Sequence, residues 1–303
     1  MFFTVTLNFV LFRVLPGTAV SDLSRVPRAT PALRAALARN FGLDQPLWRQ
    51  YLAYLGRLAH GDLGVSFDNQ QPVWHNLRAA LANTLPLVLV ATLVAILFGV
   101  VVGVVSAWRR GTLLDHLGTA LAVALFSFPV QWLGLMLVIV LAGRLPTGGM
   151  TDPFLFHASY WQHVRDVARH TVLPGLTLAL GLFGSFALVV RSSMIETLGE
   201  DYLLTARAKG LRPWAVVRRH ALRNALLPTT TLIALTLGHL VAGAILVETV
   251  FSWPGIGRTV YTAVLNRDYP MLQGAFLLLT LSVLAANLVA DLLYAHLDPR
   301  VGT

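Results

Sequence analysis

Acidic residues in apolar surroundings are the first candidates for chemistry in this chain. Glu248 and Asp291 both lie in stretches rich in Leu, Val and Ala. An ionisable side chain inside a membrane span is functional by default, and proton relay is one such function. Both residues fall near the ends of their stretches, where water and headgroups reach them. Structural anchoring is therefore the favoured interpretation, with proton relay as the alternative.

Nucleophile and metal-ligand patterns are weak. Ser185 and His239 lie on adjacent apolar stretches and could pair as nucleophile and base. The local sequence GLFGSFAL does not match the GxSxG pattern, so an intramembrane hydrolase is disfavoured. His157, His163 and His170 are not spaced to share one helical face, so we expect surface histidines and no metal site. The chain has no cysteine, which excludes disulfides and Cys-based metal sites.

A phosphate-binding loop of the GxxxxGKS/T kind is also missing. Lys209 is the only lysine of the chain, and it precedes Gly210 where the motif needs a lysine after glycine. Any ATP-driven work by this chain would therefore need a separate ATPase polypeptide.

The composition is that of an all-α polytopic membrane protein. Of 303 residues, 56% are hydrophobic and 12% charged, and the mean hydropathy is +0.67. The net charge of +9 comes almost entirely from arginines scattered between apolar runs. A nucleic-acid-binding stripe would gather them with aromatic residues, so membrane surfaces and anionic partners explain the charge better.

The apolar runs predict about six transmembrane helices. They cover residues 1–15, 81–107, 113–142, 172–195, 226–251 and 271–293. The first is too short to cross a hydrocarbon layer of roughly 30 Å comfortably. Arg109 and Arg110 directly follow the second run and place that end in the cytoplasm, so both termini are expected inside. Residues 16–78, rich in Pro and Gly, are expected to form an extracytoplasmic lobe.

Three smaller patterns concern packing. In the lobe, Leu47, Tyr51, Leu55 and Leu58 form a helical stripe that predicts a small packed core more readily than a peptide groove. The pair Gly99 and Gly103 permits close helix approach, although simple backbone tolerance is an equal explanation. Gln131 either lines a pathway or makes a hydrogen bond between helices. Ser127, Trp132 and Ser185 are further candidate pathway residues.

The segment 196–228, ETLGEDYLLTARAKGLRPWAVVRRHALRNALLP, is neither apolar enough for lipid nor loose enough for disorder. Acidic residues at its start and basic residues before Gly210 suit the two ends of a helix dipole. Gly210 is expected to end this helix in a left-handed conformation, and Pro213 to begin a second one. Trp214, Val217 and Ala221 then share one side of the second helix, with Arg219 and Arg223 on another.

Such an amphipathic elbow could simply meet anionic headgroups. However, the strings DYLLTARAKGL and RHALRNALLP resemble the cytoplasmic coupling loop of ABC-importer permeases of the dipeptide/oligopeptide family. Leu204, Thr205 and Ala206 occupy the places of the family's EAA motif, so its acidic residue is missing, and Leu227-Pro228 follows at the longer distance typical of peptide permeases. Further counterparts occur in order: LPG, GLDQPLWRQYL, GDLGVSF, RRGTLLD, FSFPVQWLGL, RSSMIETLGEDY, VETVFSWPGIG, RDYPMLQG and DLLYAHLDPRV.

The resemblance implies a type I ABC importer permease fold in the inner membrane of a prokaryote. Residues 1–15 would be a first helix, which we predict to be truncated, 16–78 the lobe, and 79–303 a core with five transmembrane helices. The implied partners are a second permease, two cytoplasmic ATPase subunits that bind ATP and Mg, and an extracytoplasmic solute-binding protein. The chain itself would hold no cofactor and would not be an enzyme.

The resemblance also implies the residues that couple to the ATPase: Glu200, Asp201, Thr205, Ala206, Arg207, Ala208, Lys209, Gly210, Leu211, His220, Asn224 and Pro228. Ala206 and Ala208 would form a slim docking face. Di- and oligopeptides are the expected solutes, whereas nickel complexes, glutathione or another small solute are alternatives. A secondary carrier or channel without ATPases is the competing class.

Overall fold

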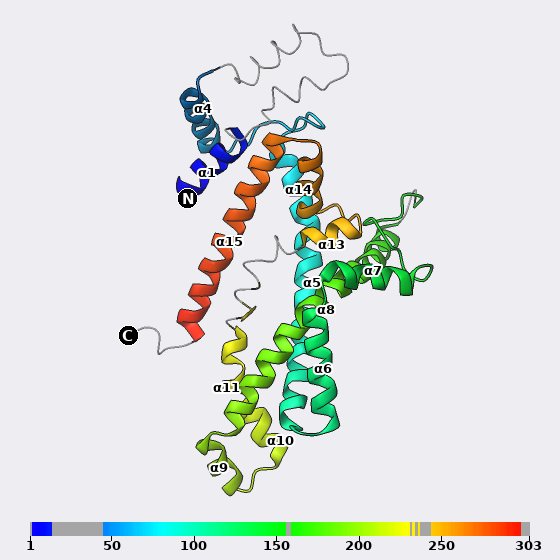
Figure 1. Cartoon of the computed structure of the whole chain (residues 1–303), viewed down its shortest axis with the longest axis vertical. Coiled ribbons are helices and arrows are strands. Elements are labelled where there is room, and N and C mark those ends of the chain that lie inside the picture. Colours follow the sequence, from blue (N-terminus) through cyan, green and yellow to red (C-terminus); the bar gives the residue numbers. More distant parts are fainter. Residues whose placement is uncertain are drawn as a thin grey trace. The chain divides into compact units, whose positions relative to one another are not determined.

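Helices make up the regular structure in the computed structural model, which describes residues 2–13, 45–155, 159–230, 232–233, 236 and 244–297 (Figure 1). The chain forms two compact units. One comprises residues 1–83 and 255–282, and the other comprises residues 84–254 and 283–303. Helices α5 (Val73–Trp108) and α15 (Tyr269–Leu297) run through both.

The first unit contains α1 (Phe2–Arg13), α4 (Leu47–Ala59), the start of α5, α14 (Ile256–Leu265) and the start of α15. The predicted stripe lies on α4, and its Tyr51 packs on Phe9 of α1 with 5.1 Å between ring centroids. The Tyr51 hydroxyl lies 2.7 Å from Oγ1 of Thr6. Leu47, the first residue of the stripe, stays 52% exposed. Tyr51, Leu55 and Leu58 are half-buried, and α4 has no fully buried residue.

Two of the quoted motifs meet in the same unit. The Ser66 hydroxyl of GDLGVSF donates to Oδ2 of Asp268 in RDYPMLQG over 2.5 Å. The other carboxylate oxygen of Asp268 accepts from the backbone N–H of Met271. Because Asp268 is buried, this carboxylate fixes the turn before α5 to the start of α15.

The second unit contains the rest of α5 and α15 with α6 (Leu113–Ser127), α7 (Val130–Leu141), α8 (Tyr160–Leu198), α9 (Asp201–Ala208), α10 (Pro213–Val216), the π-helical turn η1 (Val217–Ala221), α11 (Leu222–Ala225) and α13 (Ile245–Val250).

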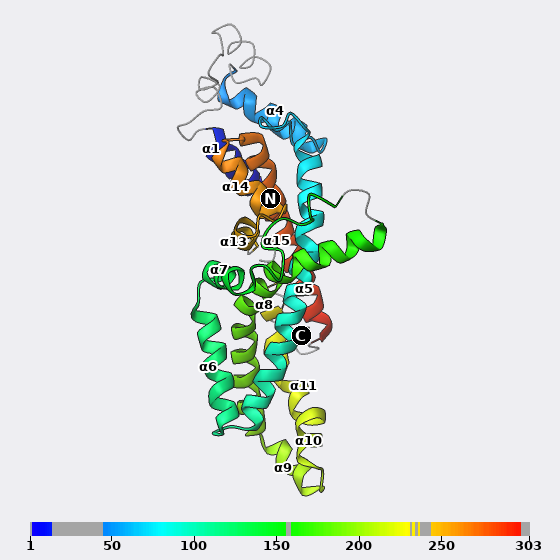
Figure 2. The same ribbon diagram turned by 90° about the vertical axis from the view of Figure 1, so that its right-hand side faces the viewer.

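Helices α5, α6 and α8 pack on one another in this unit (Figure 2). A Cβ on Gly99 would lie 2.6 Å from Cβ of Phe186, and one on Gly103 would lie 2.8 Å from Cβ of Val190. On a neighbouring face of α8, a Cβ on Gly184 would collide with the backbone of α6. The GxxxG pair therefore does serve close helix approach, because α5 and α8 are closer together here than a Cβ on either glycine would allow.

The apolar run 113–142 is not one straight helix. Helices α6 and α7 meet at an angle of 106°, and the break lies at Phe128 and Pro129. Proline cannot donate an N–H to α6 and pushes the residue before it into extended backbone, which Phe128 adopts with ψ of 132°. The predicted span over 113–142 is therefore made of two helices, and the pair can still serve as one broken span.

Among the described residues, α5, α8 and α15 up to Val289 are long and apolar enough to cross a membrane, and the α6–α7 pair is a candidate for a fourth crossing. Helix α1 is apolar but shorter. The expected crossing at 226–251 falls partly outside the described residues, as do Pro16 of the LPG motif and the chain end after Leu297. Helix α5 begins at Val73, within the range expected for the lobe.

Glu248 and His170, two of the candidate functional residues, are more buried than expected. Glu248 on α13 is 0% exposed, so the expectation that water reaches it is wrong. It accepts a hydrogen bond of 2.6 Å from the Thr84 hydroxyl, which joins α13 to α5. His170 on α8 is also buried, and its Nδ1 lies 2.9 Å from the Asp166 carbonyl oxygen. His163 is exposed as expected, whereas His157, His239 and the side chain of Asp291 lie outside the described residues.

Candidate functional site

The segment 196–228 folds as the predicted elbow. Helix α9 begins at Asp201, whose carboxylate favours the positive end of the helix dipole. The chain then reverses at Gly210, which has a φ of +76°, and α10 begins with Pro213 in its first turn. The two predicted arms and the bend between them are therefore confirmed. The second arm contains the π-helical turn η1, a feature that sequence rules do not predict.

The inner face of the elbow packs on the ends of α5 and α8 (Figure 1). Its buried side chains come from both arms and include Leu203, Ala206, Val216, Val217 and Ala221. They contact Val104 and Ala107 of α5 and Val190 and Met194 of α8. This shared apolar cluster holds both arms against the two long helices, so a force on the elbow would reach α5 and α8 together.

Ala206 differs from its predicted place. Its side chain is 7% exposed and belongs to this inner cluster, so it does not form a docking face with Ala208. Residues i and i+2 of an α-helix point in directions about 200° apart around the axis. Ala208 is therefore on the exposed side when Ala206 is buried. Ala208 alone therefore keeps the expected exposure.

Tyr202 joins the two arms across the bend. Nδ2 of Asn224 donates to the Tyr202 hydroxyl over 2.8 Å, and this hydroxyl donates to the His220 carbonyl oxygen over 3.4 Å. Tyr202, which the prediction omitted, thus contacts two predicted coupling residues, Asn224 and His220. The DY pair of the quoted motif contained this residue, but only the fold shows that the tyrosine bridges two helices.

A hollow of about 300 Å³ lies beside this tyrosine, between the end of α8 and the second arm. Its polar lining includes Glu196, Glu200, Tyr202 and Asn224, and Pro228 closes one side. Glu200, Asn224 and Pro228 of the predicted set therefore share one surface of the elbow.

The outer face of the elbow is exposed and basic. Thr205, Ala208 and Lys209 are exposed on the first arm, as are Glu200 and Asp201 at its start, and Leu211 is half-buried after the bend. The second arm exposes Arg218, Arg219 and Arg223. The side chain of Arg207 lies outside the described residues. Beyond the acidic start of α9, this face offers mainly cationic groups, which suit an anionic surface.

The end of α5 contacts the second arm through aromatic rings. The ring centroids of Trp108 and Trp214 are 5.3 Å apart, within the range of favourable aromatic pairs. The guanidinium of Arg109 lies 5.1 Å from the Trp108 ring centroid, a cation–π distance. The predicted apolar side of the second helix is therefore split: Val217 and Ala221 are buried inside, whereas Trp214 lies half-exposed against α5.

The predicted pathway residues cluster around the α6–α7 bend. Ser127 ends α6, and Gln131 and Trp132 lie in the first turn of α7. Ser185 lies on α8, where its hydroxyl donates to the Leu182 carbonyl oxygen over 2.7 Å. A Cβ on Gly181 would lie 3.3 Å from Cγ2 of Val130, so the start of α7 lies beside α8 one turn before Ser185. The fold thus places these candidates in one region, but their role in a pathway stays a prediction.

Within the described ranges, His, Cys, Asp and Glu side chains do not gather in groups of three or more that could hold a metal ion. The features that stand out are instead mechanical: a braced elbow, long packed helices and a broken span.

Comparison with known proteins gives a consistent result. Residues 95–303 match the family described as binding-protein-dependent transport system inner membrane component. The chain is 41% identical over 318 residues to the di/tripeptide transport system permease protein of Pseudomonas aeruginosa, covering 99% of this chain and 94% of that protein. It is 38% identical over 314 residues to the dipeptide transport system permease protein of Escherichia coli, covering 97% and 93%. It is also 38% identical over 313 residues to the probable D,D-dipeptide transport system permease protein of Escherichia coli, covering 98% and 92%.

Proposed function

The chain belongs to the family of binding-protein-dependent transport system inner membrane components, and from this premise we propose that it forms half of the import pathway for dipeptides and short oligopeptides in an ABC importer. The near full-length similarity to permeases that are named for dipeptide transport supports this solute class over nickel complexes, glutathione or other small solutes. The elbow supports the mode of action, because its exposed basic face is braced on the long helices α5 and α8.

In this proposal the motor is a separate pair of ATPase subunits, which bind ATP and Mg in the cytoplasm. Their closure would draw this elbow toward that of a second, related permease. The inner cluster of Leu203, Ala206 and Val217 would pass the displacement to α5 and α8, and these helices would move as rigid levers. Hydrolysis would then reset the pathway.

The remaining partners follow from the same arrangement. The arginines of the elbow and the pair Arg109 and Arg110 favour a cytoplasmic location for this end of the second unit. An extracytoplasmic solute-binding protein would deliver the peptide on the opposite side. A secondary carrier or channel is the competing class, and it would need no ATPase.

Site-specific crosslinking in the assembled complex tests the proposal. Because the chain has no cysteine, Ala208→Cys introduces a single thiol on the exposed side of the elbow. With the ATPases and second permease co-expressed, this thiol should crosslink to an ATPase subunit. Ala206→Cys is the matched control on the same helix and should react far less, because its side chain is buried. An ATPase that neither co-purifies with the chain nor crosslinks to Ala208→Cys would favour the carrier class.

A further inference from the structure

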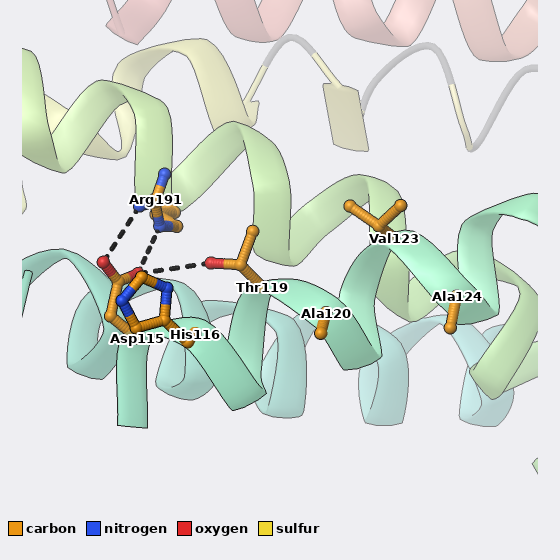
Figure 3. Close-up of a pocket in the computed structure, with 7 residues that line it drawn as sticks. All are labelled: Asp115, His116, Thr119, Ala120, Val123, Ala124 and Arg191. Carbon is orange, nitrogen blue, oxygen red and sulfur yellow. Dashed lines mark hydrogen bonds and ion pairs between the residues drawn. The ribbon is translucent and has the colours of Figure 1, made fainter. Parts of the chain in front are cut away.

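An ion pair between a buried carboxylate and a half-buried guanidinium joins α6 to α8 away from the elbow. Nε of Arg191 lies 2.7 Å from Oδ1 of Asp115, and Nη2 of Arg191 lies 3.1 Å from Oδ2 (Figure 3). Two parallel N–H donors on one carboxylate give a bidentate pair, which restricts orientation as well as distance. Asp115 is 3% exposed, so water competes little for its carboxylate.

The same carboxylate also fixes the turn between α5 and α6. Oδ2 of Asp115 accepts from the backbone N–H of Gly111 over 3.0 Å, and Oδ1 accepts from the Thr119 hydroxyl over 3.2 Å. Gly111 has a φ of +79°, so the turn reverses sharply here. Asp115 therefore ties the turn, the first part of α6 and α8 to one group.

The turn is attached to the elbow as well. It begins directly after Trp108, whose ring packs on Trp214 of the second arm. On α8, the backbone N–H of Arg191 lies 3.0 Å from where a Cβ of Gly103 would stand, so α5 approaches α8 closely at the level of the ion pair. The elbow, the ends of α5 and α8 and the start of α6 are thus connected around Asp115 and Arg191.

Packing beside the ion pair is loose on one side. A hollow of about 540 Å³ opens next to it, lined by His116, Thr119, Ala120, Val123, Ala124 and the pair itself (Figure 3). Closely packed side chains resist sliding, whereas a hollow does not. On this side of α6, the two hydrogen bonds between Asp115 and Arg191 hold the first part of the helix against α8. Further along, Ala122 of α6 packs directly on Gly184 of α8, so displacement that enters α6 at Asp115 is carried onward by close packing.

We propose that Asp115 and Arg191 are positioning residues that transmit displacement of the elbow to α6 and, along α6, to the α6–α7 bend with Ser127 and Gln131. A buried ion pair is a weak source of stability, since apolar replacements often fold as well or better. Its geometry, however, defines one register between two helices. This inference rests on the proposed import function. It identifies Asp115 and Arg191 as the residues that connect the elbow to the α6–α7 pair.

The first test uses the full importer reconstituted with its ATPases, with the number of ATP molecules hydrolysed per peptide imported as the readout. Asp115→Asn keeps the size and an acceptor oxygen for the turn but removes the charge and the bidentate pairing. We expect assembly and ATP hydrolysis to persist while the ATP-to-peptide ratio rises about fivefold or more, the lower range of typical coupling between sites. An unchanged ratio, or loss of both activities in equal proportion, would overturn the inference.

A second test restores the connection covalently within one sample. The double variant Asp115→Cys, Arg191→Cys is assembled with cysteine-free partners and treated with a short reducible bifunctional thiol reagent. The crosslinked form should regain a ratio near that of the wild type, and reduction should raise the ratio again. Equal ratios before and after reduction would reject the positioning role. A wild-type complex that imports no peptide with ATP would instead reject the proposed function, so the two failures are distinguishable.

Discussion

Gly210 is the residue on which the shape of the elbow depends. Its φ of +76° is a left-handed conformation that costs an L-residue about 1–2 kcal/mol and is a clear outlier for a β-branched one. A Cβ there would meet nothing within 4 Å, so substitution acts through backbone strain and not through collision. Gly210→Val should therefore rotate one arm against the other, and peptide uptake should fall severalfold while the partner ATPases still hydrolyse ATP.

Gly210→Asn is the matched control for this prediction, since Asn tolerates the left-handed region better than other residues with a side chain. Its uptake should stay close to wild type. Normal uptake by Gly210→Val, measured with labelled dipeptide in cells or proteoliposomes, would show that the bend is not needed for coupling.

A second prediction at this scale concerns Ala206 and Ala208, which share α9 but lie on its buried and its exposed side, respectively. Ala206→Leu adds bulk to the inner cluster, where overpacking typically costs about 1–3 kcal/mol, and should lower the unfolding temperature of the purified complex. Ala208→Leu should leave that temperature unchanged but weaken recovery of the ATPase in pull-downs. The reverse pattern would mean that the two faces of the first arm are assigned the wrong way round.

Local rules account for what the sequence predicted at the residue scale. Gly210 suits the left-handed bend and Pro213 suits the first turn of a helix. Neither preference depends on contact with another part of the chain. The orientation of Ala206 and the bridging role of Tyr202 depend on which side of the first arm meets α5 and α8. That information comes from residues more than eighty positions away in α5, so the segment alone did not contain it.

At the scale of elements, close packing of α5 on α8 reverses the usual effect of a Gly→Ala substitution on stability. In a helix interior, Gly→Ala normally stabilises by roughly 1 kcal/mol. At Gly103, however, the added Cβ would lie 2.7 Å from the Ala187 carbonyl oxygen and 2.8 Å from Cβ of Val190. Gly103→Ala should therefore lower the thermal unfolding midpoint of the detergent-purified protein by forcing the helices apart.

Gly56→Ala on α4 is the control, because a Cβ there meets nothing within 4 Å. It should leave the unfolding midpoint unchanged or raise it slightly. If Gly103→Ala were as harmless as Gly56→Ala, the approach of α5 and α8 would be wider than the structure shows.

Apolar runs predicted the long helices well, because a run of about twenty apolar residues rarely forms anything other than a transmembrane helix. They did not predict the 106° break between α6 and α7, since a proline inside an apolar run is also compatible with a continuous helix, as Pro86 in α5 and Pro174 in α8 show. The pairing of Asp115 with Arg191 was likewise out of reach, because nothing local to either residue identifies its partner.

At the scale of the whole molecule, the order of the motifs predicted the family, and the family model and the near full-length relatives confirm it. Composition alone indicated only a membrane protein. The solute and the partner subunits are not encoded in any one element, because they depend on surfaces contributed by other chains. The central claim is that this polypeptide is moved by a motor outside itself.

Uptake of a labelled dipeptide into proteoliposomes tests that claim most directly. Vesicles with this chain, its second permease, the ATPases and the binding protein should accumulate peptide only when ATP is supplied on the side of the elbow. Vesicles that lack the ATPases, or whose ATPases carry an inactivated catalytic site, should accumulate none. ATP-independent accumulation by vesicles that contain only this chain and its second permease would contradict the account.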